Sequence, residues 1–337
     1  MDDTNNPSLT ILIPTYNRAK DLQQTLDAMC RVDISELKVN FFVIENGLRN
    51  CTQQVVEDFG ERLPIRYLYE PMPGKNNALN KAINEVELGQ IVVFTDDDVT
   101  PKPDWLKQIV GATERWSQYD IFGGAINSLW PYGQPPKWWG AGPNGERWNL
   151  AGHGQFSKEE CIYPSNCAPC GPNMWIRKKV FDKGYRFDGS IGPNAKINVM
   201  GDEGSFLHML RKEGYKFVYS PYPVVGHRIQ RELLSPLGIK KRIISEGRGS
   251  VRIYGLPRDL LLKRSRLLWC GHRLFALIFA LLRYCNPINY LNANRGYAAR
   301  LEAIGDIAYN IESFRIFWES SKPGWISFPK KCKELNK

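Results

Sequence analysis

The sequence lacks, directly after any predicted strand, the glycine-rich motifs by which many α/β proteins hold phosphate groups. No G-x-G-x-x-G motif follows a predicted strand, which counts against a dinucleotide-binding dehydrogenase. No G-x-x-x-x-G-K-[ST] motif occurs either, which counts against a P-loop enzyme. Zinc-finger, RNA-recognition and homeodomain patterns are missing as well, so we expect no nucleic acid partner. Eight cysteines in 337 residues do not indicate a disulfide scaffold.

The sequence also has no long uninterrupted apolar run at its start. Residues 1–8 are mostly polar, so we expect a disordered N-terminus without a secretory signal, and a cytoplasmic protein. The apolar run Leu274–Leu282 covers nine residues, whereas a helix needs about 20 to span a bilayer. Basic residues surround it, so residues 260–285 either lie in the interface of an anionic membrane, at the inner face of the cytoplasmic membrane, or pack on the catalytic domain.

Positive charge is concentrated in one part of the chain. The formal net charge is +10, and the stretch from Arg228 to Arg283 holds thirteen Lys and Arg against three Asp and Glu. Such an imbalance indicates an anionic partner. Nucleotide phosphates and anionic lipid headgroups both fit.

Strand and helix patterns alternate in the N-terminal third. Short β-branched and aromatic runs predict strands, and amphipathic segments between them predict helices. Repeated βα units of this kind predict an α/β fold with a mainly parallel sheet sandwiched by helices. The four predicted strands are Leu9–Ile13, Asn40–Ile44, Ile65–Tyr69 and Ile91–Phe94.

The pattern changes after a predicted helix at residues 103–116. Residues 130–156 hold four tryptophans among many glycines and prolines, which predicts an irregular excursion whose rings stack on sugars or cap the core. A strand at residues 216–220 is expected to stop at Pro221. We therefore expect a catalytic domain over residues 9–228 and a basic, helical extension over residues 229–337.

Three consecutive carboxylates, Asp96, Asp97 and Asp98, follow the buried run Ile91–Phe94. Ligands gather at the carboxyl ends of such strands, and carboxylate oxygens favour hard cations such as Mg²⁺ or Mn²⁺. The other interpretation is an acidic loop or a helix N-terminus before Pro101. Polar turns end the other strands as well, so the set would suit a nucleotide diphosphate held with a metal.

A second acidic pair, Asp202 and Glu203, stands at the start of a predicted helix. A carboxylate there is stabilised by free backbone amides, so an N-cap is the simple explanation. The lone His227, at the end of an apolar stretch, is by itself more often structural.

In this order, the motifs resemble those of the family 2 glycosyltransferases. The resemblance covers about residues 9–254, and its most specific parts are Thr10–Arg18, Phe94–Leu106 and Gly201–Tyr215. It implies a GT-A fold and an inverting enzyme that uses a nucleotide-sugar donor and a divalent cation, Mn²⁺ or Mg²⁺.

The resemblance also implies roles for individual residues. It places Glu203, with Asp202 second, as the catalytic base; Asp96 and Asp98 as a D-x-D pair; and Asp98, His227 and Asp96 at the metal. Asn173 would line the acceptor or sugar pocket, and we expect Trp138 and Trp139 of the irregular excursion to line it too, because such rings stack on sugars. The donor nucleotide would be bound by Pro14, Thr15, Tyr16, Arg18, Glu45, Lys75, Asn80, Asp96 and Asp97.

Two positions depart from the family pattern. Glu45 stands where such enzymes usually have an Asp that reads the nucleobase. The acidic pair is usually Glu then Asp, whereas here Asp202 precedes Glu203, so the base carries the longer side chain.

These observations predict transfer of a sugar from a nucleotide-diphosphate donor to a hydroxyl of a saccharide or lipid-linked acceptor, in surface polysaccharide or glycan synthesis. The first alternative is a sugar nucleotidyltransferase, although the turn Pro14–Arg18 has no glycine for a pyrophosphate loop. The second is a non-catalytic sugar-binding or membrane-scaffold protein derived from a transferase.

Overall fold

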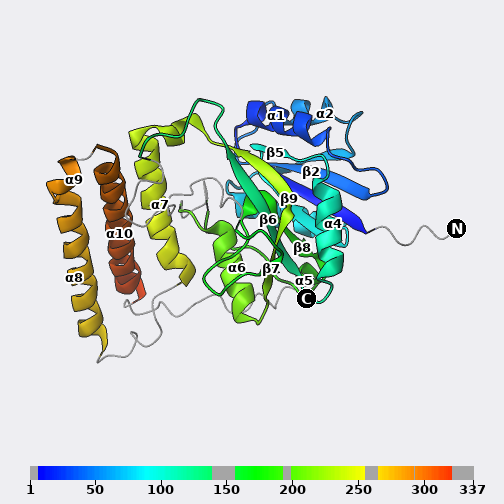
Figure 1. Ribbon diagram of the computed structural model, residues 1–337. Coiled ribbons are helices and arrows are strands. Elements are labelled where there is room, and N and C mark those ends of the chain that lie inside the picture. The colour runs from blue at the N-terminus through cyan, green and yellow to red at the C-terminus, as the bar shows by residue number, and fades with distance from the viewer. Residues whose placement is uncertain (1–6, 139–155, 193–198, 255–264, 292, 321–337) are drawn as a thin grey trace. The chain divides into compact units, whose positions relative to one another are not determined.

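The computed structural model describes residues 7–138, 156–192, 199–254, 265–291 and 293–320 (Figure 1). The chain divides into two compact units, which are described separately. The first comprises Met1–Leu129, Ala151–Ile197 and Asp202–Ile229, and the second comprises Trp130–Leu150, Asn198–Gly201 and Gln230–Lys337. The division after Ile229 lies beside the expected domain boundary, but Trp130–Leu150 groups with the second unit.

The first unit is built on one mixed sheet. Its strand order is β3-β2-β1-β4-β8-β6-β9-β5, and β7 (Cys161–Ile162) pairs with β9. The pairs among β3, β2, β1 and β4 are parallel, as expected from the βα repeats, while β8 is antiparallel to β4. The main strands are β1 (Ser8–Thr15), β2 (Lys38–Asn46), β3 (Ile65–Glu70), β4 (Ile91–Phe94), β5 (Val99–Pro101), β6 (Ile121–Leu129), β8 (Met174–Arg177) and β9 (Phe217–Arg228).

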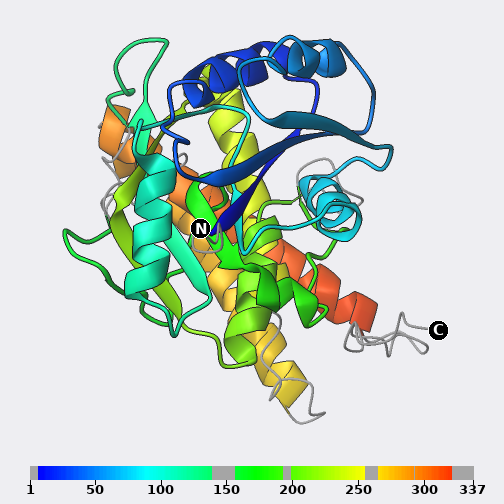
Figure 2. The same cartoon turned by 90° about the vertical axis from the view of Figure 1, so that its right-hand side faces the viewer.

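Helices cover both faces of this sheet, and Figure 2 shows the blue α1 and α2 on one side of the first strands. One core packs α1 (Ala19–Met29), α2 (Thr52–Glu57) and α4 (Trp105–Arg115) on one face. The other packs α3 (Lys75–Glu85), α5 (Lys178–Asp182) and α6 (Asp202–Lys212) on the opposite face. Consecutive residues of β4 alternate between the two cores, which explains why its sequence is continuously apolar.

The expectation that Pro221 ends a strand is wrong, because β9 continues to Arg228. The β6–β9 register shifts between Gly123 and Ala125, so residues 220–223 form an irregularity in which a proline needs no ladder hydrogen bond. Beyond it, β9 pairs with the short strand β5, whose residues directly follow the Asp triplet.

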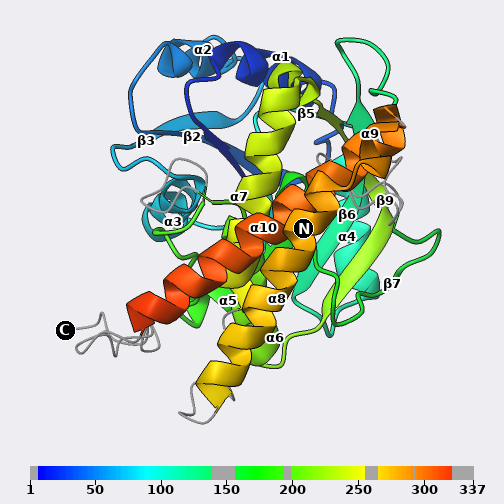
Figure 3. The ribbon, with the colours of Figure 1, turned by 90° about the vertical axis from the view of Figure 1, so that its left-hand side faces the viewer.

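The second unit is mainly helical from residue 231 onward over its described residues, while its described segment 130–138 is irregular. It contains η2 (Arg231–Leu234), α7 (Pro236–Tyr254), α8 (Ser265–Cys285), α9 (Ile288–Leu291) and α10 (Ala293–Ser320). The long helix α10 packs against α7 and against α8 (Figures 1 and 3). Among the described residues, the segment Leu268–Leu291 is long and apolar enough to cross a membrane, judged by length and composition alone. The length of the apolar segment was underestimated from the sequence, because only its nine uninterrupted apolar residues were counted.

Part of the positive charge of residues 228–283 is paired with acids inside the second unit. Arg248 and Arg252 both form ion pairs with the buried Glu312 of α10. Arg283 pairs with Asp306 and Glu302 of the same helix. The acids that pair with these three arginines lie outside the stretch, so a count within residues 228–283 missed them.

Candidate active site and metal site

Topology brings the polar strand ends of the first unit together. Because β2, β1 and β4 are parallel neighbours, the turns after Thr15, Asn46 and Phe94 lie at one edge of the sheet. Since β8 runs antiparallel to β4, with Phe94 opposite Met174, the turn η1 (Gly171–Asn173) that precedes β8 lies at the same edge. This edge is the candidate site.

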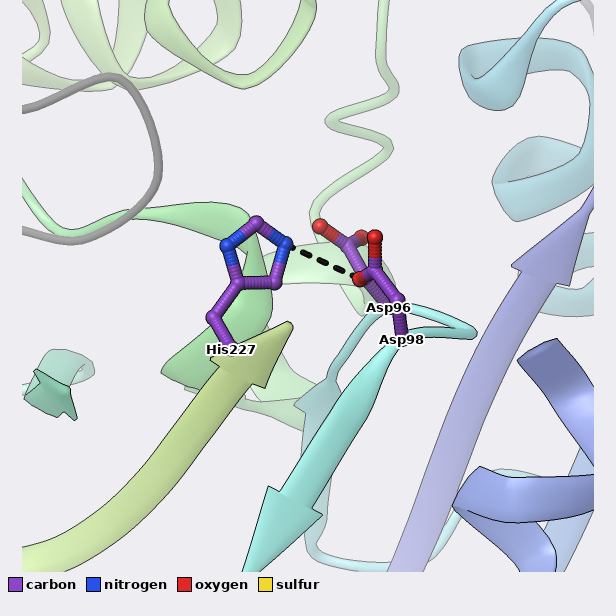
Figure 4. A group of neighbouring side chains, drawn as sticks. All are labelled: Asp96, Asp98 and His227. Atoms are coloured by element: carbon purple, nitrogen blue, oxygen red, sulfur yellow. Dashed lines mark ion pairs between the residues drawn. The ribbon is translucent and has the colours of Figure 1, made fainter. Parts of the chain in front are cut away.

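The pairing of β5 with β9 brings His227 to the Asp triplet. Val99 and His227 are register partners, and the imidazole Nε2 lies 2.9 Å from Oδ1 of Asp98 (Figure 4). Asp96 completes a group in which one ligand atom of each residue lies within 4.8 Å of the others. The sequence proposed these three residues as metal ligands, and the fold places them together.

Arg18 is the counter-ion of the triplet. Its guanidinium donates to Oδ1 of Asp97 and to Oδ2 of Asp98, each at 2.7 Å. Burial raises the pKa of Asp97 to about 7, against the opposing effect of Arg18. Burial would raise the pKa of Asp98 too, but His227 and Arg18 outweigh it and hold that pKa well below its usual range. Asp98 is thereby kept ionised.

Lys75, at the start of α3, connects the triplet with the second acidic pair. Its ammonium lies 2.5 Å from Oδ1 of Asp96 and also pairs with the carboxylate of Glu203. Burial would lower the pKa of Lys75, but the charges of Asp96 and Glu203 raise it well above the usual value. The preceding residue, Gly74, has φ +125°, a backbone conformation that favours glycine at this helix start.

The two acids of the pair have opposite proton affinities. Asp202, the first residue of α6, is 2% exposed, and burial together with the charge of Glu203 raises its pKa to about 8. Burial would also raise the pKa of Glu203, but Lys75 outweighs it and lowers that pKa. A Cβ at position 171 would collide with the Glu203 carboxylate, so Gly171 makes room for that side chain.

Several residues expected to bind the nucleotide are buried instead. Pro14 and Thr15 lie inside β1, and Thr15 donates to Asp97. Glu45 is fully buried, where it accepts hydrogen bonds from the Tyr67 hydroxyl at 2.5 Å and from the backbone N–H of Asn50 at 2.9 Å. These side chains shape the site from beneath.

Tyr16 is the exception in the expected base pocket, because it is half-buried and its ring lies against Gly47. A Cβ at position 47 would approach the Tyr16 ring to 2.7 Å, and Gly47 has φ +76°. Glycine is thus required at this turn for both reasons.

Asn173 and Asn80, which were expected to contact the sugar and the donor, form hydrogen bonds inside the fold. Asn173 is fully buried; its Oδ1 accepts from the Trp105 indole at 3.0 Å, and its Nδ2 donates to the carbonyls of Ala125 and Pro223. Asn80 exchanges two hydrogen bonds with the backbone of Phe187. Both amides therefore tie together segments of the fold, with Asn173 buried and Asn80 half-buried.

Of the two tryptophans expected at the acceptor pocket, Trp138 packs within the second unit. It joins the cluster of Ile239, Ile243 and Leu301, with its ring edge-on to Tyr297 at 5.5 Å. This is the core-capping alternative. Trp139 lies outside the described residues.

Arg228, which directly follows His227, was not anticipated. It donates to the carbonyls of Val99 at 2.8 Å and Asp21 at 2.9 Å, and to the hydroxyl of Thr25 at 2.6 Å. That hydroxyl in turn donates to the carbonyl of Asp97. Arg228 thus holds the backbone of the triplet against α1. The one sequence feature that could have indicated this role is that Arg228 directly follows His227.

The side chains of Asp96, Asp98 and His227 are suitable ligands for a divalent transition-metal ion. Two carboxylates and an imidazole are ligands that Mn²⁺ accepts, and Asp96 and His227 keep 22% and 15% of their side chains exposed. Mg²⁺ would rely more on the carboxylates.

The chain is similar to known glycosyltransferases. Glycosyltransferase AglE of Haloferax volcanii is 25% identical over 256 residues, which covers 75% of this chain and 76% of AglE. Validoxylamine A glucosyltransferase of Streptomyces hygroscopicus subsp. jinggangensis is 27% identical over 107 residues, 32% of this chain and 25% of that enzyme.

Solved structures show the same fold. A mannosyltransferase from Pyrobaculum calidifontis, in complex with GDP-Man and Mn²⁺, matches with a TM-score of 0.54 and 17% identity, covering 93% of this chain and 88% of that one. TarS 1–349 of S. aureus, in complex with UDP-GlcNAc, matches with a TM-score of 0.50 and 14% identity over 92% of each chain. The expected GT-A-type fold is confirmed.

The sequence profile described as Glycosyl transferase family 2 matches residues 10–185. That match covers more than half of the chain and includes the turn after β1, Lys75 and the Asp triplet, so the protein belongs to glycosyl transferase family 2.

Proposed function

We propose that this glycosyltransferase moves a sugar from a nucleotide-diphosphate donor to a hydroxyl group of a saccharide or lipid-linked acceptor, with inversion at the anomeric carbon, in the synthesis of a surface polysaccharide or glycan. The observation that carries the proposal is the continuous charged chain from Glu203 through Lys75 to Asp96, beside Asp98 and His227. It sets a candidate base next to a candidate metal site.

Asp96, Asp98 and His227 would hold Mn²⁺ or Mg²⁺. When bound, such an ion stabilises the negative charge that grows on a diphosphate leaving group. Lys75 adds a positive charge at the same place, between the metal ligands and the base. Its role with a donor would be to pair with phosphate oxygens, for which the ammonium of a lysine is well suited.

Glu203 is the proposed general base. Lys75 keeps its pKa low, so the carboxylate is ionised at neutral pH, and 16% of its side chain is exposed. It would accept the proton of the acceptor hydroxyl as that hydroxyl attacks the sugar, a contribution on the order of 10²–10⁴-fold. Asp202 is buried and has a raised pKa, so it is the less suitable base of the two acids.

A panel of nucleotide sugars tests the proposal. GDP-Man and UDP-GlcNAc, the ligands bound to the two structural neighbours, belong in the panel together with other UDP and GDP sugars. At least one donor should raise the melting temperature in Mn²⁺ but not in EDTA, and should be slowly hydrolysed. If no nucleotide sugar binds in the presence of either cation, the proposal is wrong.

A further inference from the structure

Over residues 268–285, helix α8 carries its charges on the side that faces α10. Between Leu268 and Cys285, Arg273 and Arg283 are the only Lys, Arg, Asp or Glu residues. Arg283 pairs with Asp306 at 2.7 Å and with Glu302 at 3.2 Å, both on α10. The guanidinium of Arg273 lies 5.1 Å from the ring centre of Tyr309, also on α10. Both cations are therefore used within the helix pair.

The opposite side of α8 is apolar and exposed. We call it the outer face; it consists of Leu268, Leu274, Phe275, Ile278, Phe279, Leu281 and Leu282, which are between 44% and 78% exposed. At 100° per residue these side chains span about half of the helix circumference. The other exposed residues among the described side chains of α8 are Gly271, His272 and Cys285. Figure 3 shows α8 lying along α10 within the second unit.

This polarity is the reverse of that of a helix on the surface of a water-soluble protein, which turns its apolar stripe inward and its charges outward. A contiguous patch of seven exposed, large apolar side chains marks a surface that binds a partner or a membrane. We propose that α8 lies in the plane of a membrane, with its outer face among the lipid acyl chains and its inner face on α10.

A lipid surface fits the outer face better than a protein partner does. A protein interface surrounds its apolar centre with polar groups that fix the register, and it is enriched in Tyr, Trp and Arg. The outer face consists of Leu, Ile and Phe side chains on a helix of 21 residues, which is about 32 Å long. Acyl chains need neither a register nor a matching shape.

Exposed apolar side chains continue beyond the end of α8. In α9, Ile288 is 69%, Tyr290 58% and Leu291 85% exposed. Tyrosine is enriched at membrane–water interfaces, where its ring and its hydroxyl meet different surroundings. The apolar surface therefore extends past the end of α8, as an in-plane anchor requires.

An in-plane position fits better than a spanning one, although the segment is long enough to span. The ion pairs of Arg283 tie α8 to α10, and α10 carries Glu302, Asp306 and Glu312. If α8 spanned the bilayer as part of this pair, those charges would enter the hydrocarbon at high cost. An interfacial helix instead buries its apolar face by about 5–10 Å.

The inward arginines also change the expected lipid preference. The sequence indicated basic residues facing anionic headgroups, whereas Arg273 and Arg283 face α10. Binding through the outer face is hydrophobic, so it needs no anionic lipid and resists salt. This inference is independent of the proposed reaction, because it rests on residues of the second unit alone.

Flotation of the full-length protein with phosphatidylcholine vesicles, at 0.15 and 0.5 M NaCl, tests the proposal. The substitution Leu282→Glu places a charge on the outer face, at a side chain that is 64% exposed. Leu237→Glu on α7 is the matched control, because Leu237 is 63% exposed. Melting curves without vesicles check that both variants are folded.

The unsubstituted protein should float at both salt concentrations. Leu282→Glu should lower the partition coefficient by at least about tenfold, the double variant Phe275→Glu/Leu282→Glu should lower it further, and Leu237→Glu should leave it unchanged. Failure to float with neutral vesicles, or flotation that the double variant retains, would overturn the proposal. So would sedimentation showing a dimer that Leu282→Glu dissociates, because the outer face would then join two copies of the chain.

Discussion

The imidazole Nε2 of His227 lies 2.9 Å from Oδ1 of Asp98, because Val99 and His227 are opposite one another in the β5–β9 pair. Two segments that are distant in the sequence thus contribute to one candidate metal site. The site depends on the part of β9 that follows the register shift, because this part pairs with β5. Arg228, the next residue, fixes this pairing by its bonds to Val99 and Thr25.

Replacing the histidine should weaken metal binding more than folding. In His227→Ala, Asp98 keeps Arg18 as its counter-ion, so the protein should remain folded. The Mn²⁺ concentration that gives half of the donor-induced rise in melting temperature should increase by at least about tenfold. An unchanged Mn²⁺ dependence would remove His227 from the ligand set.

The acidic pair offers a direct comparison of two isosteric variants. Glu203→Gln should keep donor binding and lose transfer by about 10²–10⁴-fold, since the amide cannot accept the proton. Asp202→Asn should retain most activity, because Asp202 with its pKa raised to about 8 is already neutral at pH 7. Transfer assays at saturating donor measure both. Full activity of Glu203→Gln together with an inactive Asp202→Asn would assign the base to Asp202.

The same carboxyl group should make stability depend on pH. The pKa of Asp202 is raised in the folded state, so its contribution is present below about pH 4 and is lost as the pH rises towards 8. Asp202→Asn removes this loss. The melting temperature of the variant minus that of the unsubstituted protein should therefore increase between pH 5 and pH 8. A constant difference would mean that Asp202 ionises normally.

Arg18 should stabilise the protein through the two buried carboxylates that it contacts. Arg18→Ala leaves Asp97 and Asp98 without that cation, at a cost of about 3 kcal/mol in the free energy of unfolding. The pKa of each carboxyl rises on its removal, so the loss should be larger at pH 8 than at pH 5. Urea unfolding measures it. Arg62→Ala, which breaks an exposed pair with Asp27, should cost under about 1 kcal/mol at both pH values.

Asn173 should be a structural residue. Asn173→Ala leaves the Trp105 indole and the carbonyls of Ala125 and Pro223 without their partner, at a cost of about 2–4 kcal/mol. Trp105→Phe removes one of these bonds and should cost less. Donor affinity, measured by calorimetry on the folded fraction at low temperature, should be unchanged in Asn173→Ala. A loss of affinity without a loss of stability would restore its place in the sugar pocket.

The sequence was sufficient for the parallel half of the sheet, where buried strands and amphipathic helices alternate in order. It predicted the association of Asp96, Asp98 and His227 only through the resemblance, since no local pattern reveals that β9 reaches β5. The strand β9 was cut short because Pro221 usually ends a strand, and a register shift opposite Gly124 accommodates it here.

Several residues that were expected to contact ligands are buried. The resemblance implied ligand contacts for Glu45, Asn173 and Asp97, but each has hydrogen-bond partners inside the fold. Such partners come from distant segments, as Tyr67 does for Glu45, and local sequence does not indicate them. The direction in which Arg273 and Arg283 point was hidden for the same reason, because their acidic and aromatic partners lie on α10.

The most direct test of the central claim is donor hydrolysis in the presence of Mn²⁺, compared between the unsubstituted protein and Asp98→Asn. Asparagine keeps the shape of the side chain and removes the charge that His227 and Arg18 hold in the ionised form. We expect hydrolysis that EDTA abolishes and Mn²⁺ restores, and that Asp98→Asn reduces by at least about 10²-fold while remaining folded. Hydrolysis that is independent of the cation, or equal in Asp98→Asn, would contradict a metal-assisted transferase site at the Asp triplet.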